Sequence, residues 1–190
     1  TDSLVGSEMC IRDSFNGDPR ALALGRLGQK VKKAASKEAD CERSLSAYVW
    51  GFDAKVSGPD LVHHNVFFSD VTNSEFYDIK KGKMPVDPSI YICAQDRGKN
   101  APYPTTERFE IILNAPPVSK RKSTPEDYEK CKEITFKRLE MFGLNFQLNL
   151  KRENLTTPQD FEKLFPASDG SLSDSYTHLT LPTKSSVEIS

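Results

Sequence analysis

The sequence predicts an α+β fold with a mixed, largely antiparallel sheet and flanking helices. Two observations carry this prediction. Short segments alternate apolar and polar side chains with the two-residue period of a half-buried strand, and segments with helix-start signals lie between and after them. The expected order is strand, strand, helix, strand, strand, helix, strand, helix, which is typical of the α+β class.

The first strand is expected at residues 44–53, where Tyr48 and Trp50 share one face. A second strand is expected at 62–69, which is rich in β-forming residues. The segment before them, residues 19–40, has only a partial helical stripe, interrupted by glycines. It predicts a weak helix or an irregular approach segment.

A short helix is expected at residues 73–81, with Phe76, Ile79 and Tyr77 packing together. The third strand, residues 89–95, follows it. Its apolar positions alternate, so one face of this strand is expected to be buried.

The fourth strand is expected at residues 107–115. A strong helix follows, with Thr124 as its N-cap, Pro125 at its first position and Gly143 as its terminator. These residue types satisfy or tolerate the unpaired backbone groups at helix ends, which is why they predict the boundaries.

A fifth strand is expected at residues 145–152, with Phe146, Leu148 and Leu150 facing inward. Residues 157–166 then repeat the N-cap pattern and predict a last short helix that ends at a proline.

The composition excludes several classes of protein. The chain has 190 residues, 26 Lys and Arg against 27 Asp and Glu, and a net charge of -1. A nucleic-acid binder needs an excess of basic residues, which is missing here. No apolar run approaches the ~18 residues of a membrane span. The four cysteines show no Cys-x-x-Cys spacing, so neither a zinc motif nor a disulfide framework is expected, and a reducing cytoplasm is the default.

The two ends differ from the rest of the chain. The strings at 5–14 and 175–186 show no helical or strand period and resemble translated adapter sequence. The alternative is that both are genuine disordered tails. The expected organisation is therefore an adapter-like or disordered end at 1–14, a partial domain at 15–173 and a second such end at 174–190.

His63 and His64 suggest a metal site, but adjacent residues in a strand project to opposite faces. No metal site is therefore expected, and a structural histidine is favoured over one ring that lines a substrate tunnel. Asp96 and Arg97 are interpreted as a surface turn with a local ion pair, in preference to a polar pair that fixes a loop near a cofactor or tunnel mouth.

Four segments together resemble the bacterial carotenoid (phytoene-type) desaturases. They are HHNVFFSD at 63–70, IYICAQDR at 90–97, ERFEIILNAPP at 107–117 and TPQDFEKLFP at 157–166. The similarity covers roughly Arg43 to Leu172, and the hydroxycarotenoid 3,4-desaturase (methoxyneurosporene dehydrogenase) branch resembles it most.

The resemblance implies a two-domain, flavin amine oxidase-like enzyme that removes hydrogen from a long polyene by hydride transfer to FAD, and this chain would be its incomplete substrate domain. No G-x-G-x-x-G motif is present, so the FAD-binding part is expected elsewhere in the whole protein. The fragment alone is expected to bind no FAD and to be inactive. The implied partners are a carotenoid, a peripheral membrane surface at the cytoplasmic side and the missing FAD-binding portion, with no nucleic acid.

The resemblance assigns no catalytic residue here. The polar groups expected to face the substrate cavity are His64, Asn65 and Gln95. Gln95 shares one face of the third expected strand with Tyr91 and Cys93, where it faces either a cavity or solvent. Two alternatives remain for the function: another flavin amine oxidase-like oxidoreductase, or a non-catalytic module that binds an apolar ligand or a protein partner.

Overall fold

The computed structural model describes residues 17–70, 74–98 and 102–172. Both predicted adapter-like ends, 1–14 and 174–190, lie outside these residues. The chain divides into two compact units, Thr1–Ala39 and Asp40–Ser190, which are described separately.

The described part of the first unit contains helix α1 (Pro19–Ala23) and a short 3-10 helix, η1 (Lys32–Glu38). Gly25 and Gly28 lie between them with φ values of 75° and 105°. Because residues with a side chain avoid this left-handed region, the two glycines end one helical piece before the next begins. This agrees with the weak, interrupted helix predicted for 19–40.

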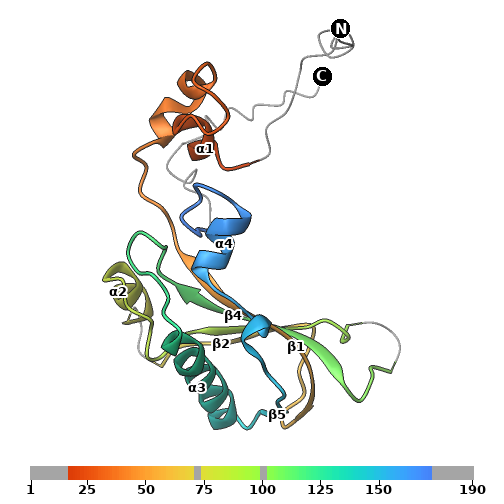
Figure 1. Ribbon diagram of the computed structural model, residues 1–190. Helices are drawn as coiled ribbons and strands as arrows, with labels where there is room; N and C mark the ends of the chain where they lie inside the picture. Colours follow the sequence, from red (N-terminus) through yellow and green to blue (C-terminus); the bar gives the residue numbers. More distant parts are fainter. Residues whose placement is uncertain (1–16, 71–73, 99–101, 173–190) are drawn as a thin grey trace, which may run out of the picture. The chain divides into compact units, whose positions relative to one another are not determined.

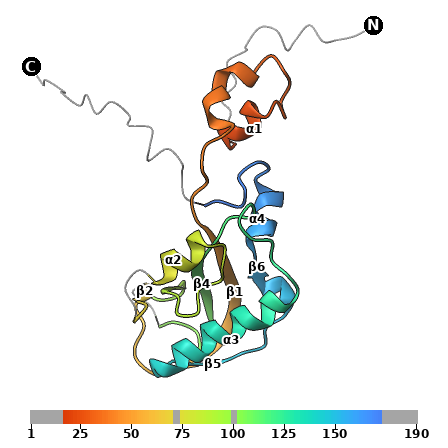
Figure 2. The ribbon, with the colours of Figure 1, turned by 90° about the vertical axis from the view of Figure 1, so that its left-hand side faces the viewer.

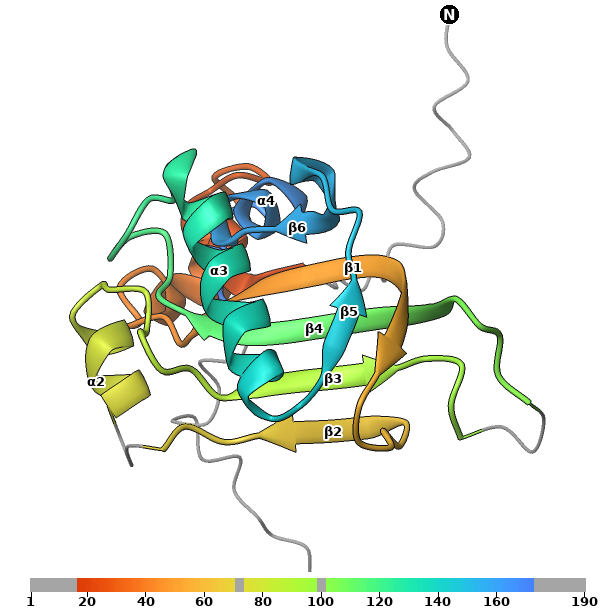
Figure 3. The same cartoon turned by 90° about the horizontal axis from the view of Figure 1, so that it is seen from below.

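The second unit is built on one antiparallel sheet (Figure 1). Its strands follow the order β2-β3-β4-β1-β5, with β6 paired to β1 (Figure 3). Every strand pair that the structure describes is antiparallel, which confirms the predicted α+β class. The strands are β1 (Ser46–Ser57), β2 (His64–Phe67), β3 (Ile90–Ala94), β4 (Glu107–Ala115), β5 (Asn145–Gln147) and β6 (Leu155–Thr156). The helices are α2 (Ser74–Lys80), α3 (Glu126–Met141), the 3-10 helix η2 (Arg152–Asn154) and α4 (Pro158–Leu164).

The register of the sheet brings the predicted apolar faces together. Trp50 of β1 is the register partner of Ile111 of β4, and Ile92 of β3 is the partner of the same residue. All three side chains are fully buried. Since side chains alternate along each strand, this row defines the core face of the sheet.

Helix α3 lies across the strands on that core face (Figures 2 and 3). The contact is largely aromatic. The Trp50 ring lies 5.4 Å from the Tyr128 ring and 5.8 Å from the Phe136 ring of α3. Within the sheet, Phe146 of β5 meets Phe109 of β4 at 5.1 Å in a perpendicular arrangement. Edge-to-face pairs of this kind add to the stabilisation that burial itself provides.

Two glycines allow the turn after β1 to approach the end of α3. Gly143 ends the helix with a φ of 80°, as predicted. Gly58 has a φ of 127°, and a β-carbon placed on it would lie 2.1 Å from the Gly143 carbonyl oxygen. Only glycine fits at this crossing.

Helix α2 forms where predicted but faces the sheet with different residues. Phe76 and Tyr77 are exposed, while Glu75 and Ile79 are buried. The predicted aromatic packing is wrong because the Glu75 carboxylate turns inward, where it accepts hydrogen bonds from the Ser89 amide and the Asn114 side chain. Two such bonds offset the cost of burying the carboxylate.

The fifth predicted strand is shorter than expected. Only residues 145–147 pair with β1, and the segment beyond them crosses over to form β6 beside Val49 and Trp50. The Asn154 side chain anchors this crossing through a 2.8 Å hydrogen bond to the Gly51 carbonyl oxygen. These contacts join residues about a hundred positions apart, so the local alternation at 145–152 does not predict where pairing stops.

Helix α4 begins at the predicted cap. The Thr157 hydroxyl accepts from the Asp160 amide, and the Asp160 carboxylate accepts from the Thr157 amide at 3.0 Å. Burial raises the pKa of this carboxyl, but hydrogen bonds from Thr157, and then from Arg152 and Lys163, lower the pKa to about 2.

Replacing Thr157 by alanine is expected to destabilise the chain by about 1 kcal/mol, because a helix cap is lost. Since the pKa of Asp160 is lower in the folded state, its contribution is complete above about pH 4, the value of an unfolded aspartate, and disappears as the pH falls towards 2. Denaturant unfolding between pH 7 and pH 2 measures both effects. Thr105→Ala, in an exposed turn, is the control and should change neither.

Candidate functional site: the open face of the sheet

The face of the sheet opposite α3 carries the alternate set of side chains, and we refer to it as the open face. Val66, Tyr91, Ile112 and Val49 form one row across β2, β3, β4 and β1, as successive register partners. Val66 is exposed and the other three are half-buried. The open face thus presents an apolar strip that the packing of α3 leaves uncovered.

A polar row runs beside this strip. His64 is the register partner of Cys93, and Cys93 is the partner of Glu110. His64 is exposed, and its Nδ1 lies 2.7 Å from the Tyr91 hydroxyl. Burial raises the pKa of Tyr91, and Cys93 and Glu110 raise it further, so the phenol stays neutral and can donate a hydrogen bond.

His63 lies at the bend immediately before β2, with its ring centroid 4.2 Å from that of His64. The predicted separation of the two histidines onto opposite faces is wrong, because faces alternate only within a strand and His63 lies outside it. Its Nδ1 donates to the carbonyl oxygens of Arg97 at 2.8 Å and Ala94 at 3.1 Å. Its Nε2 lies 3.8 Å from the Cys93 sulfur.

Asn65, the second predicted substrate residue, does not share the open face with His64. Asn65 is the register partner of the buried Ile92, and its side-chain amide bonds to both backbone groups of Val62. Gln95 lies one residue beyond β3 and is exposed. The structure therefore separates Asn65 from His64, and the contact of all three residues with a substrate stays a prediction.

Asp96 and Arg97 pair with different partners. Asp96 binds Arg108 at the surface, whereas Arg97 forms a two-pronged ion pair with Glu107, at 2.6 and 2.9 Å. The Arg97 and Glu107 side chains are only 10% and 4% exposed. The prediction of a surface ion pair is therefore wrong for Arg97. Its side chain instead connects the loop after β3 to β4 and also donates to the Leu61 carbonyl oxygen.

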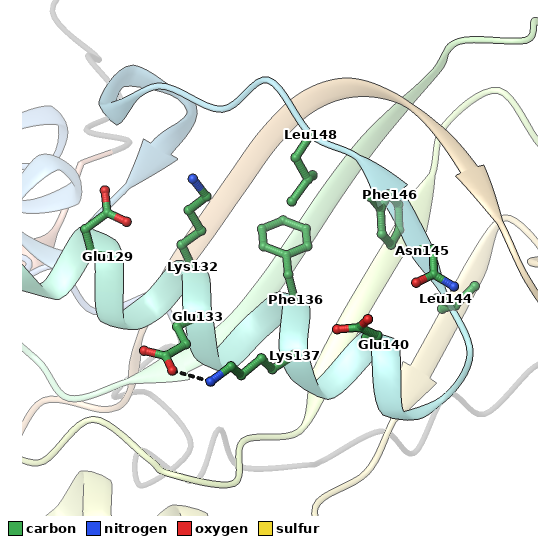
Figure 4. A pocket seen from close by; sticks show the side chains of 10 residues that line it. All are labelled: Glu129, Lys132, Glu133, Phe136, Lys137, Glu140, Leu144, Asn145, Phe146 and Leu148. Atoms are coloured by element: carbon green, nitrogen blue, oxygen red, sulfur yellow. Dashed lines mark hydrogen bonds and ion pairs between the residues drawn. The ribbon is translucent and has the colours of Figure 1, made fainter.

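A groove of about 450 Å³ lies elsewhere, between α3 and the segment 144–148 (Figure 4). Phe136 and Leu148 point towards each other in it, and charged side chains of α3, including the Glu133–Lys137 pair, form its rim. The residues that line it include neither a histidine nor a cysteine. The groove therefore offers an apolar surface, but its lining lacks the imidazole and thiol groups that the open face carries.

Sequence reasoning missed that Tyr91, Cys93 and both histidines meet at one place. The alternation of 89–95 put Tyr91 and Cys93 on one face, which the structure confirms. Their proximity to the histidines depends on the β2–β3 register, which a single strand pattern does not contain.

Among the helices that the structure describes, none has both the length and the apolar character needed to cross a bilayer.

Comparison with characterised proteins finds relatives along most of this chain. It is 49% identical over 158 residues to a hydroxyneurosporene desaturase of Cereibacter sphaeroides and 43% identical over 169 residues to one of Rhodobacter capsulatus. It is also 27% identical over 138 residues to a 4,4'-diaponeurosporene oxygenase of Staphylococcus aureus. These matches include 83%, 89% and 71% of this chain, respectively.

The chain spans about a third of the length of these curated relatives: 32%, 34% and 28% of each. No protein-family profile matches the chain.

Proposed function

We propose, from the premise that this chain belongs to the carotenoid desaturase family, that it is part of an enzyme that dehydrogenates a long polyene in carotenoid biosynthesis. The observation that carries this proposal is the 49% identity to a hydroxyneurosporene desaturase over 83% of the chain. We further propose that residues 15–173 belong to the substrate domain of a two-domain enzyme, the rest of which lies in the other two thirds of such a protein.

The open face supports a role in holding the hydrocarbon chain. The row Val66, Tyr91, Ile112 and Val49 crosses four strands, and neighbouring strands lie about 4.8 Å apart, so the strip is roughly 14 Å long. An elongated, half-covered apolar surface suits a polyene, because each contact removes hydrocarbon from water.

The polar row supports a role in orienting the substrate. The His64–Tyr91 hydrogen bond places a hydroxyl donor and an imidazole at the edge of the apolar strip. A carotenoid that carries a hydroxyl group would have a hydrogen-bonding partner there, and one hydroxyl at the right distance fixes the register of a long chain. Asn65 and Gln95 are proposed to flank this contact, at the start of β2 and beyond the end of β3.

FAD is the cofactor that the family implies, and it would accept hydride from the substrate. The residues of this chain do not form its usual cradle, since the sequence contains no G-x-G-x-x-G motif. We therefore assign FAD binding to the remainder of the protein and derive no step through it. The chain purified alone is expected to lack flavin absorbance, and a yellow preparation that retains flavin after gel filtration would contradict this assignment.

A peripheral, cytoplasmic attachment to the membrane is also proposed, because a carotenoid is nearly insoluble in water and has to be drawn from lipid. Exposed apolar side chains on and near β2, Val62, Val66 and Phe68, support this proposal.

A charge on the apolar strip tests the proposed function. In the full-length protein, Val66→Asp is expected to lower the rate of polyene dehydrogenation at least about tenfold, because the substrate would then bury a carboxylate. Product formation is measured by chromatography with hydroxyneurosporene in lipid vesicles. Val86→Asp is the matched control, since this valine is 76% exposed and lies outside the strands. Equal activity of the two variants would refute the proposed role of the open face.

A further inference from the structure

Three side chains that favour transition metals lie together at the edge of the open face. One potential ligand atom each from His63, His64 and Cys93 lies within 4.8 Å of the other two. The distance between His63 Nε2 and Cys93 Sγ is 3.8 Å. A nitrogen and a sulfur bound to one tetrahedral zinc ion, at about 2.1 and 2.3 Å, lie roughly 3.6 Å apart. This pair is therefore almost at ligand spacing.

The surrounding backbone fixes the His63 ring in the orientation that a metal ligand needs. Carbonyl oxygens only accept hydrogen bonds, so the contacts with Arg97 and Ala94 place the proton on Nδ1 and leave the Nε2 lone pair facing Cys93. Metal-bound histidines usually donate their second ring nitrogen in this way. Gly98, with a φ of 90°, brings the loop close, since a β-carbon on it would lie 3.2 Å from that of His63.

His64 completes the group from the solvent side. It is the register partner of Cys93 and is exposed, so an ion has a path to the cluster. For Nε2 to bind an ion, His64 donates its Nδ1 proton to the Tyr91 hydroxyl oxygen, and this hydrogen bond can hold the ring. Glu110 is the next register partner of Cys93 and adds negative charge beside the sulfur.

We propose that His63, His64 and Cys93 form a binding site for one Zn²⁺-like transition-metal ion, with the fourth coordination position open to water. Two imidazoles and a thiolate select borderline and soft metals over Mg²⁺ and Ca²⁺, which prefer oxygen ligands. Binding releases the Cys93 thiol proton to solvent. This site goes beyond the proposed desaturase function and does not rest on it, because all its ligands lie within this chain.

Titration with Co²⁺, a coloured substitute for Zn²⁺, tests the site. The full 190-residue chain, reduced with a non-thiol reagent and stripped by a chelator, is expected to bind one Co²⁺ with a thiolate-to-cobalt absorption band in the near ultraviolet, and Zn²⁺ is expected to displace it. Cys93→Ser is expected to lose the band. His63→Gln and His64→Gln are each expected to weaken binding at least about tenfold, since replacing even an outer partner of a metal ligand has effects of that size.

Cys41→Ser is the matched control and should keep the band. Cys131 does not compete for the ion, because burial raises the pKa of its thiol to about 12. A second measurement uses the thermal midpoint, which Zn²⁺ should raise in the unaltered chain and in Cys41→Ser but not in Cys93→Ser. The same titration is repeated on the full-length protein, in which the sheet has its native neighbours. The proposal is overturned if neither protein shows the band, or if the band survives Cys93→Ser. The contact between His63 and Cys93 would then be a simple thiol–imidazole hydrogen bond.

Discussion

Replacing Trp50 by alanine is expected to lower the free energy of unfolding by about 3–5 kcal/mol, because a large aromatic side chain is removed from a close-packed core. Trp50 is fully buried in the middle of β1 and contacts Tyr128 and Phe136 of α3. Its loss would leave a cavity between sheet and helix and remove both aromatic contacts. Equilibrium denaturation in urea measures the change as a shift in the transition midpoint.

Tyr77→Ala is the matched control for Trp50→Ala. Tyr77 is also aromatic but is 63% exposed on α2, so its removal should change stability by no more than about 0.5 kcal/mol. If both variants lost similar stability, α3 would not be packed on Trp50 as described.

Breaking the Arg97–Glu107 ion pair from one side is expected to cost about 3–5 kcal/mol, because the remaining charge would stay buried without its partner. The hydrogen bond to Glu107 raises the pKa of Arg97, which is consistent with a guanidinium that stays charged in this position. The single variants Arg97→Met and Glu107→Gln should each show this loss in urea denaturation.

The double variant Arg97→Met/Glu107→Leu should be more stable than the sum of the single effects predicts, because no buried charge remains unpaired. The exposed Glu133–Lys137 pair provides the control. Its side chains are 61% and 71% exposed, so solvent screens the pair and breaking it should change stability far less than breaking the Arg97–Glu107 pair. Single variants at Arg97 or Glu107 that cost less than the exposed pair would contradict the buried ion pair.

The sequence patterns gave correct strand positions in those segments where the local preference for a strand agrees with the packing in the folded chain. Strand β4 (Glu107–Ala115) has its predicted boundaries, because alternate residues along its whole length pack on the core face. The cap at Thr157 was also predictable, since the groups that form it lie within four residues.

Predictions were wrong where distant partners decide the outcome. The exposed Phe76 and buried Glu75 of α2 reverse the usual preference, because Ser89 and Asn114 supply hydrogen bonds to the carboxylate. Strand β6 was not predicted, since two residues give too short a pattern and its pairing depends on β1.

By itself, the sequence determined the α+β class, the order of the main elements and the resemblance to carotenoid desaturases, because short-range periodicity, capping and contiguous motifs all lie along the chain. Only the tertiary structure decided that Arg97 pairs with Glu107, that Asn65 does not share the face of His64, and that His63 meets Cys93. Strand register sets these contacts, and register is a relation between segments that no single segment encodes.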